Sequence, residues 1–438
     1  MKKTTKAKGL YIDAKESRNI AKENLRTIKE LKKKRAAYKP EDYITTMRDP
    51  KNIVEFDDLR TYFFTDNGVV KAVNGVSFDI PQGSTVGVVG ESGCGKSVTS
   101  LSLMQLVQGP MGQIVDGSIR FRTTVRRQVG SEPLIVPERD KDGNVVKDEN
   151  GQPKMVGVKG HFGKPRKKAI YEEHEEVVDI AKLPVSEMAS IRGREIAMIF
   201  QEPMTSLNPV FTVGDQLDEM TLLHTNGATK EMAKERSIEM LKLVGIAMPE
   251  HVYDSFPHQL SGGMRQRAMI AMALCCNPKL IIADEPTTAL DVTIQAQILD
   301  LLRDVKDKID GSILLITHDL GVIAEMVDYV VVMYSGRVVE KGTVEEIFKN
   351  PLHPYTIGLQ KSKPVVGRKV DRLYSIPGNV PNPINMREHC YFRNRCDKRC
   401  EACLGGYPPM IQVSPTHFVA CYRATEQAEN AGEEKTEK

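Results

Sequence analysis

The sequence has no long hydrophobic run. Nowhere in its 438 residues is there a stretch of the roughly 18–20 uncharged apolar residues that a membrane-spanning helix needs. The beginning, MKKTTKAKGLYIDAKESRNIAKENL, is basic but lacks the apolar centre of a signal peptide. We therefore expect a cytoplasmic protein that reaches a membrane only by docking on other subunits.

The sequence also lacks a strong excess of charge of one sign. Its formal net charge is +3, which by itself gives no reason to expect nucleic-acid binding. The basic segments contain no interleaved aromatic residues on which bases could stack, so we expect no nucleic-acid partner. With 40% hydrophobic and 27% charged residues, the composition is that of an ordinary globular protein with one large or two medium domains.

Charge is concentrated at the two ends of the chain. Residues 1–51 form a lysine-rich extension that we expect to be disordered or helical. Residues 424–438 form an acidic, polar tail that we expect to be disordered, because it cannot bury a core. The basic extension could contact anionic lipid or could simply be solvated, and the sequence leaves both interpretations open.

Short apolar runs alternate with helical segments between residues 52 and 350. VEFDDLRTYFF and VVKAVNGVSFDI alternate apolar and polar residues, as half-exposed strands do. STVGVVG, EIAMIFQ, KLIIADEP and SILLITHD are typical of buried parallel strands, and SVTSLSLMQLV, RQRAMIAMALCC and TIQAQILDLLRDVKDKI of helices. The alternation predicts an α/β fold, a mostly parallel sheet covered by helices, with ligands at the carboxyl ends of the strands.

Two segments interrupt this pattern. Between about residues 121 and 179 the chain is turn-rich and charged, which predicts an insertion made of a hairpin followed by a charged helix. Near residue 350, proline and glycine become frequent. We therefore expect a main domain over residues 52–350, carrying the insertion, and a small C-terminal domain over residues 351–423.

A phosphate-binding motif follows one of the predicted strands. Residues 90–97 read GESGCGKS, which fits the Walker A pattern between a strand and a helix. The glycines let backbone N–H groups face a phosphate, Lys96 bridges its oxygens and the Ser97 hydroxyl ligates Mg²⁺. Cys94 fills a variable position of the loop. The expected ATP-binding residues are Gly90, Glu91, Ser92, Gly93, Cys94, Gly95, Lys96, Ser97 and Val98.

Two adjacent carboxylates end another predicted strand. The run LIIADE matches the Walker B pattern that accompanies Walker A. Asp284 is expected to hold Mg²⁺ through its water shell. Glu285 is expected to act as the general base that polarises the attacking water.

The segment LSGGMRQR, which begins at Leu260, resembles the signature motif of the ABC transporter family. The resemblance implies a cassette with a mostly parallel core sheet, an antiparallel β subdomain and an α-helical signature subdomain. It also implies that the motif grips the γ-phosphate of ATP held by a partner subunit. Met264 replaces the more usual glutamine. The residues concerned are Leu260, Ser261, Gly262, Gly263 and Met264.

Further residues match this family in order. Gln201 matches the glutamine that senses Mg²⁺ and water, Asp291 the D-loop at the dimer interface and His318 the switch histidine that holds the water. The family also stacks an aromatic side chain on adenine, and Phe63 is the expected residue. The alternative is that Phe63 only packs the sheet.

The segments FQEPMTSLNPV, NPLHPYT and IPGNVPNP are similar to those of the oligopeptide and dipeptide permease group, which also contains nickel importers. This resemblance implies an ATP-hydrolysing subunit that energises import by ATP-driven dimer closure at the cytoplasmic face of the membrane. Its expected partners are a second ATPase subunit in a heterodimer, two membrane permease subunits and an extracytoplasmic solute-binding protein. The alternatives are a motor for nickel or another small solute and a soluble ABC ATPase outside transport.

Five of the eight cysteines lie in the last fifth of the chain. A cytoplasmic protein rarely keeps disulfides, so the group predicts a metal site. The resemblance implies a 4Fe–4S cluster held by Cys390, Cys396, Cys403 and Cys421. Cys400 leaves the third ligand open, and structural Zn²⁺ or unbound thiols are the alternatives.

Overall fold

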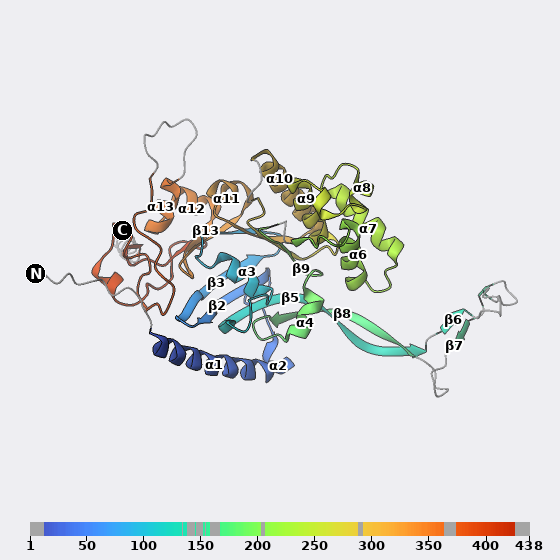
Figure 1. Ribbon diagram of the computed structural model, residues 1–438, viewed down its shortest axis with the longest axis horizontal. Helices are drawn as coiled ribbons and strands as arrows, with labels where there is room; N and C mark the ends of the chain where they lie inside the picture. The colour runs from blue at the N-terminus through green and yellow to red at the C-terminus, as the bar shows by residue number, and fades with distance from the viewer. Residues whose placement is uncertain are drawn as a thin grey trace, which may run out of the picture. The chain divides into compact units, whose positions relative to one another are not determined.

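The computed structural model describes residues 13–133, 135–137, 145, 152–153, 155–157, 167–202, 206–287, 292–362 and 374–424 (Figure 1). The chain divides into two compact units. One unit comprises Met1–Phe121 with Val178–Lys438, and the other comprises Arg122–Val177. The smaller unit lies inside the predicted insertion.

The core of the larger unit is a mostly parallel sheet. In the described part of the chain its strand order is β14-β15-β13-β12-β4-β11-β10-β9. The five strands from β12 to β9 in this order run parallel, and β13, β15 and β14 continue the sheet antiparallel. The predicted parallel core is confirmed. The strands are β4 Thr85–Val89, β9 Ile196–Ile199, β10 Leu280–Asp284, β11 Ser312–Thr317, β12 Tyr329–Tyr334, β13 Arg337–Thr343, β14 Ile411–Gln412 and β15 Phe418–Val419.

The central strands are buried along their whole length. Every residue of β4, β10 and β11 is buried, which explains why their sequences are continuous apolar runs without alternation. Parallel pairing sets Asp284 beside Ile316, and Thr317 beside Val89. The carboxyl ends of β10, β11 and β4 therefore meet at one edge of the sheet.

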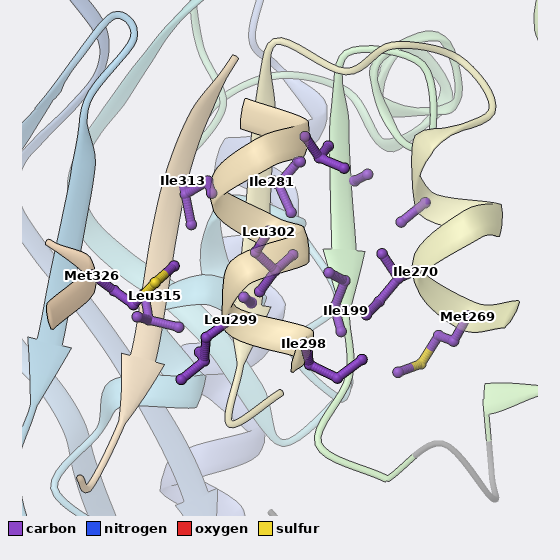
Figure 2. Close-up of a cluster of buried hydrophobic side chains, with 14 of the residues drawn as sticks. Ile199, Met269, Ile270, Ile281, Ile298, Leu299, Leu302, Ile313, Leu315 and Met326 are labelled. Carbon is purple, nitrogen blue, oxygen red and sulfur yellow. The ribbon is translucent and has the colours of Figure 1, made fainter. Parts of the chain in front are cut away.

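Helices cover this sheet. Figure 2 shows the side chains of Leu299 and Leu302 from α10 close to Ile281 of β10 and to Ile313 and Leu315 of β11. All five side chains are buried in one hydrophobic cluster, which fixes α10 on the sheet. From the Walker A loop onward, the described helices of this unit are α3 Lys96–Leu103, α4 Val185–Ile191, α6 Val213–His224, α7 Lys230–Leu243, α8 Pro249–Tyr253, α9 Gly262–Leu274, α10 Val292–Ile309, α11 Leu320–Met326, α12 Val344–Lys349 and α13 Pro354–Lys361, with short 3-10 turns at Pro257–Gln259 and Glu401–Leu404.

A second sheet contains the two strands predicted before Walker A. Its order is β1-β8-β5-β2-β3, and β2 pairs antiparallel with both β3 and β5. Phe56 and Phe78 stack across β2 and β3 with ring centroids 4.4 Å apart, within a second buried cluster. The strands are β1 Ile44–Thr45, β2 Asn52–Thr65, β3 Gly68–Pro81, β5 Gly112–Pro133 and β8 Lys167–Asp179, and β6 Ile135–Pro137 pairs with β7 Met155–Gly157 in a separate small sheet.

The helix predicted at the end of the insertion is wrong. Lys167–Asp179 forms strand β8, which lies next to β5 in the antiparallel sheet. The run of charged residues in YEEHEE favours a helix locally, but pairing with a neighbouring strand overrides that local propensity.

Part of the basic extension is a helix packed on the antiparallel sheet. Helix α1, Ala14–Ala36, begins after Asp13, whose carboxylate accepts hydrogen bonds from the backbone N–H groups of Lys15 and Glu16. Asn24 donates a hydrogen bond of 2.9 Å to the Thr65 carbonyl, and Ile28 is buried. These contacts attach α1 to the β2–β3 hairpin (Figure 1). Helix α2, Pro40–Tyr43, follows it.

The described C-terminal residues belong to the larger unit and do not form a separate one. Strand β15 pairs with β13 at the edge of the core sheet. Met386, Tyr391 and Phe392 are buried in the same hydrophobic cluster as α10. The expected disordered tail lies, from residue 425 onward, outside the described residues.

His353 makes the stability of this fold pH-dependent. Its buried ring caps α13, because Nδ1 accepts a hydrogen bond of 3.0 Å from the Tyr355 N–H. Burial lowers the pKa of His353 from 6.5 to about 4, partly opposed by Glu340. Between these values the unfolded chain binds the proton and the folded chain does not. Stability that is present above pH 6.5 is therefore lost as the pH falls toward about 4, by up to about 3 kcal/mol.

Urea unfolding of the wild type and of His353→Asn between pH 7 and about pH 4.5 checks this. Asparagine can still cap the helix but does not titrate. The free energy of unfolding of His353→Asn should therefore fall less steeply than that of the wild type as the pH is lowered. Equal slopes for the two proteins would contradict the assignment to His353.

Candidate functional site

The backbone of the Walker A loop depends on its glycines. Gly95 has φ 101°, in the left-handed region, and a Cβ there would collide with the Ala72 carbonyl oxygen. A Cβ on Gly90 would collide with the Met333 carbonyl oxygen. Strand β4 thus leads into a tightly packed loop, and α3 begins at Lys96, so the N-terminal end of the helix lies at the loop.

The loop borders a cavity of about 450 Å³. Side chains from the segments that directly follow β9, β10 and β11 line the same cavity, so residues far apart in the sequence converge here. The lining residues are Ala72, Ser92, Gly93, Gly95, Lys96, Ser97, Val98, Gln201, Glu285 and His318. The side-chain amine of Lys96, Nζ, donates hydrogen bonds to the carbonyl oxygens of Gly90 at 2.9 Å and Glu91 at 3.3 Å.

Ser97 and Asp284 form a pair suited to a hard cation. The Ser97 hydroxyl donates a hydrogen bond of 3.0 Å to Oδ1 of Asp284, which is buried at the end of β10. Burial raises the pKa of Asp284 to about 6, the Ser97 hydrogen bond opposes the rise and the charge of Glu285 adds to it. A bound cation would offset the cost of burying this carboxylate. Hydroxyl and carboxylate oxygens are ligands that Mg²⁺ prefers, so the donor set fits that ion.

The three expected catalytic side chains, those of Gln201, Glu285 and His318, lie together. Gln201 Nε2 donates a hydrogen bond of 3.1 Å to one carboxylate oxygen of Glu285, and His318 Nδ1 lies 3.3 Å from the other. Glu285 itself has φ 48°, a left-handed conformation that costs energy for a residue with a side chain. Its N–H donates to the Ile316 carbonyl at 2.8 Å, which holds this conformation in place.

The signature residues lie away from this cavity. Ser261 caps α9, since its hydroxyl oxygen accepts a hydrogen bond of 3.3 Å from the Met264 N–H. A Cβ on Gly262 would meet no atom within 4 Å, so the backbone at the start of α9 is open on that side. No residue from Leu260 to Met264 lines the cavity.

Three other expected site residues do not bind in the cavity as expected, and a fourth is not described. The ring of Phe63 lies against Gly112 and does not line the cavity. Asp291 lies outside the described residues. Cys94 is buried, and burial raises the pKa of its thiol, which suits a packing role. Glu91 turns its carboxylate toward Arg395 in the C-terminal segment.

Sequence reasoning missed the residues that hold the Walker A loop from outside. Ala72 lines the cavity, the Tyr355 hydroxyl accepts a hydrogen bond of 2.8 Å from the Glu91 N–H, and Arg395 pairs with the Glu91 carboxylate. Tyr355 and Arg395 lie 264 and 304 positions from Glu91. Tyr355 lies in the NPLHPYT segment, but nothing in that segment indicates a contact with Glu91, and no local pattern marks Arg395.

The C-terminal cysteines lie near one another without forming a metal site. Burial and the neighbouring thiols raise the pKa values of Cys390, Cys396, Cys403 and Cys421. The sulfur atoms of Cys400 and Cys403 are 3.5 Å apart. Among the residues that the structure describes, no three His, Cys, Asp or Glu side chains are arranged to hold a metal ion. The side chains as they stand therefore do not form the expected 4Fe–4S site, although four thiols are the donor set that such a cluster takes.

Known protein families match this chain over the segments that contain the Walker A and Walker B residues of the cavity. The model of the family "ABC transporter" matches residues 73–183 and 167–288. A second model, "Oligopeptide/dipeptide transporter, C-terminal region", matches residues 339–403. The oligopeptide transport ATP-binding protein AppD of Bacillus subtilis (strain 168) is 44% identical over 86% of this chain and 98% of its own. The chain belongs to the ABC transporter family.

Other relatives carry related names. A putative peptide import ATP-binding protein of Brucella melitensis biotype 1 is 43% identical over 86% of this chain and 98% of its own. The dipeptide transport ATP-binding protein DppD of Bacillus subtilis (strain 168) is 41% identical over 87% of this chain and 97% of its own. The resemblance to the oligopeptide and dipeptide group and the ABC cassette fold are confirmed, and the protein is an ABC ATPase. Within the described residues, no helix is long and apolar enough to cross a membrane.

Replacing Glu285 tests its role as the base. Glutamine keeps the size and hydrogen-bonding shape of the side chain but cannot accept a proton from water. ATP binding to Glu285→Gln should persist while steady-state phosphate release falls about 10²–10⁴-fold. Glu219→Gln, an exposed change on α6, is the matched control and should hydrolyse ATP at the wild-type rate. Near-normal hydrolysis by Glu285→Gln would show that another group is the base.

Proposed function

We propose that this chain is the ATP-binding and ATP-hydrolysing subunit of an importer for oligopeptides or dipeptides. The observation that carries the proposal is the 44% identity to AppD over 98% of that protein, an oligopeptide transport ATP-binding protein. The match of residues 339–403 to the oligopeptide/dipeptide C-terminal region supports the same substrate class.

The proposed chemistry assigns a role to each side chain of the cavity. Lys96 leaves the carbonyl oxygens of Gly90 and Glu91 and binds the β- and γ-phosphates of ATP. Ser97 and Asp284 would hold Mg²⁺, and the ion would supply positive charge beside the phosphates.

Water activation falls to the side chains around the base. Glu285 accepts a proton from the attacking water, while Gln201 and His318, both within 3.3 Å of its carboxylate, orient that water. Phe63 is proposed to stack on adenine and Asp291 to cross the dimer interface.

The signature motif is proposed to complete the site of a partner cassette. Its distance from the cavity of its own chain and the open backbone before α9 support this role. Each ATP then lies between the Walker motifs of one cassette and residues 260–264 of the other. Binding of two ATP molecules closes the dimer and drives transport.

The proposed assembly places this subunit at the cytoplasmic face of the cell membrane. Its partners are a second ATPase subunit in a heterodimer, two permease subunits and an extracytoplasmic solute-binding protein. Phe200, Val210 and Phe211, around the segment of Gln201, are exposed apolar side chains, which supports contact of this region with a permease.

Affinity purification from detergent-solubilised membranes tests the assembly. Two permease subunits and a second ATPase should co-purify with the tagged chain, and uptake of a labelled tripeptide should be lost in a Glu285→Gln strain. Uptake of nickel instead of peptide would identify a nickel importer. Recovery of ribosomes or DNA-repair proteins without a permease would refute the transport function.

We also propose a 4Fe–4S cluster on Cys390, Cys396, Cys403 and Cys421. Support comes from the match of residues 339–403, which contain three of these cysteines, to the transporter C-terminal region, and from the burial of Cys403 and the partial burial of the other three. Four thiolates suit either such a cluster or Zn²⁺. The cluster would cross-link a proline-rich segment and takes no part in ATP hydrolysis.

Iron and sulfide analysis of anaerobically purified protein tests the cluster and its third ligand. The wild type should carry about four iron atoms per chain, the number in a 4Fe–4S centre. Cys403→Ser should lose them and Cys400→Ser should keep them. The opposite pattern would make Cys400 the ligand. Stoichiometric zinc, or protein without bound metal, would refute the cluster.

A further inference from the structure

Glu91 stands in the Walker A loop, yet its side chain binds the C-terminal segment. Arg395 Nη1 lies 2.6 Å from Oε2 of Glu91, and Nη2 lies 3.0 Å from Oε1. This is a bidentate ion pair, the strongest geometry available to an arginine and a carboxylate. The Arg395 side chain is 5% exposed and the Glu91 side chain 30% exposed, so water competes little for the pair.

Arg395 is itself held in place from behind. Its Nε donates a hydrogen bond of 3.0 Å to the Pro377 carbonyl, and Nη1 lies 3.4 Å from the Tyr334 hydroxyl. Phe392, one turn earlier, packs edge-on against Tyr334. These contacts hold the guanidinium of Arg395 in one position within the C-terminal segment, directly before Cys396.

The residue that Arg395 holds is the one that shapes the loop. The carbonyls of Gly90 and Glu91 both accept hydrogen bonds from Lys96, whose amine binds phosphate in the proposed mechanism. The Glu91 N–H donates to the Tyr355 hydroxyl at 2.8 Å, so α13 holds the same residue by its backbone. Moving Glu91 would therefore move the backbone of the loop that precedes Lys96, and with it the carbonyl oxygens that hold the Lys96 amine before ATP binds.

The ion pair also neutralises a carboxylate beside a phosphate site. Without Arg395, Glu91 would place an uncompensated negative charge in the loop that binds a triphosphate. Loss of the pair would therefore weaken ATP binding by misplacing the loop, by repelling the phosphates, or by both.

We propose that Arg395 is a positioning residue for ATP binding, through which the C-terminal segment fixes the Walker A loop. The inference rests on the proposed ATP site. It connects the cysteine-bearing segment with nucleotide affinity and leaves the chemical step to Glu285. A disturbance of the segment around Cys396 would reach the ATP site through the Arg395–Glu91 pair.

Measurements of ATP affinity and turnover test this on the full-length protein. Arg395→Ala should raise the Kd for a fluorescent ATP analogue and the KM for ATP about tenfold, while kcat at saturating ATP changes less than about twofold. Arg395→Lys should lie between Arg395→Ala and wild type, because lysine keeps the charge but not the bidentate geometry. Arg399→Ala, an exposed arginine of the same segment, should match the wild type.

A double-mutant cycle separates positioning from charge neutralisation. Glu91→Ala should weaken binding as Arg395→Ala does, and the double variant should be no worse than either single variant. If the double variant recovers wild-type affinity, Arg395 only neutralises a charge and the positioning role is wrong. Three other results would also contradict the positioning role of Arg395. They are an unchanged Kd in Arg395→Ala, effects of the two single substitutions on ATP affinity that add up in the double variant, and a loss confined to kcat.

Two controls keep the outcome interpretable. If Arg395→Ala does not fold, as judged by circular dichroism, Glu91→Ala breaks the pair while the arginine keeps its bond to the Pro377 carbonyl. Lys96→Ala tests the proposed ATP site separately. Retained ATP binding in Lys96→Ala would refute that site, whereas loss there with normal binding in Arg395→Ala would refute only the role of Arg395.

Discussion

Parallel pairing of β4, β11 and β10 is the constraint on which the rest of the structure depends. The pairing sets Asp284 beside Ile316 and Thr317 beside Val89, so three strands end at one edge of the sheet. The Walker A loop follows β4, His318 follows β11, and Asp284 and Glu285 stand at the end of β10. A shift of one residue in either register would turn the side chains at a strand end to the opposite face and dissolve the site.

The site keeps several features that are unfavourable for folding alone. Glu285 adopts a left-handed backbone conformation, and Asp284 is a buried carboxylate with a raised pKa. Both are tolerated because the surrounding strands are completely buried and their backbone pairing fixes the chain on either side. Their arrangement suits a site that is to receive a cation and an activated water.

The C-terminal segment is joined to this site by more than packing. Strand β15 extends the core sheet, Tyr391 and Phe392 enter the main hydrophobic cluster, and Arg395 reaches the Walker A loop. The C-terminal segment thus contacts the cassette both at the edge of the core sheet and at the Walker A loop. These contacts give a segment without a catalytic motif a physical route to nucleotide affinity.

The sequence by itself determined the parts of the protein whose chemistry depends on a short order of residues. GESGCGKS predicts a phosphate loop because glycine, lysine and serine must follow one another at fixed spacing, and continuous apolar runs predict buried strands such as β10. Tertiary structure alone decided that Lys167–Asp179 is a strand, that α1 packs on a hairpin, and that Arg395 holds Glu91. Those outcomes depend on partners far away in the chain, and a contact across 304 positions leaves no local pattern to read.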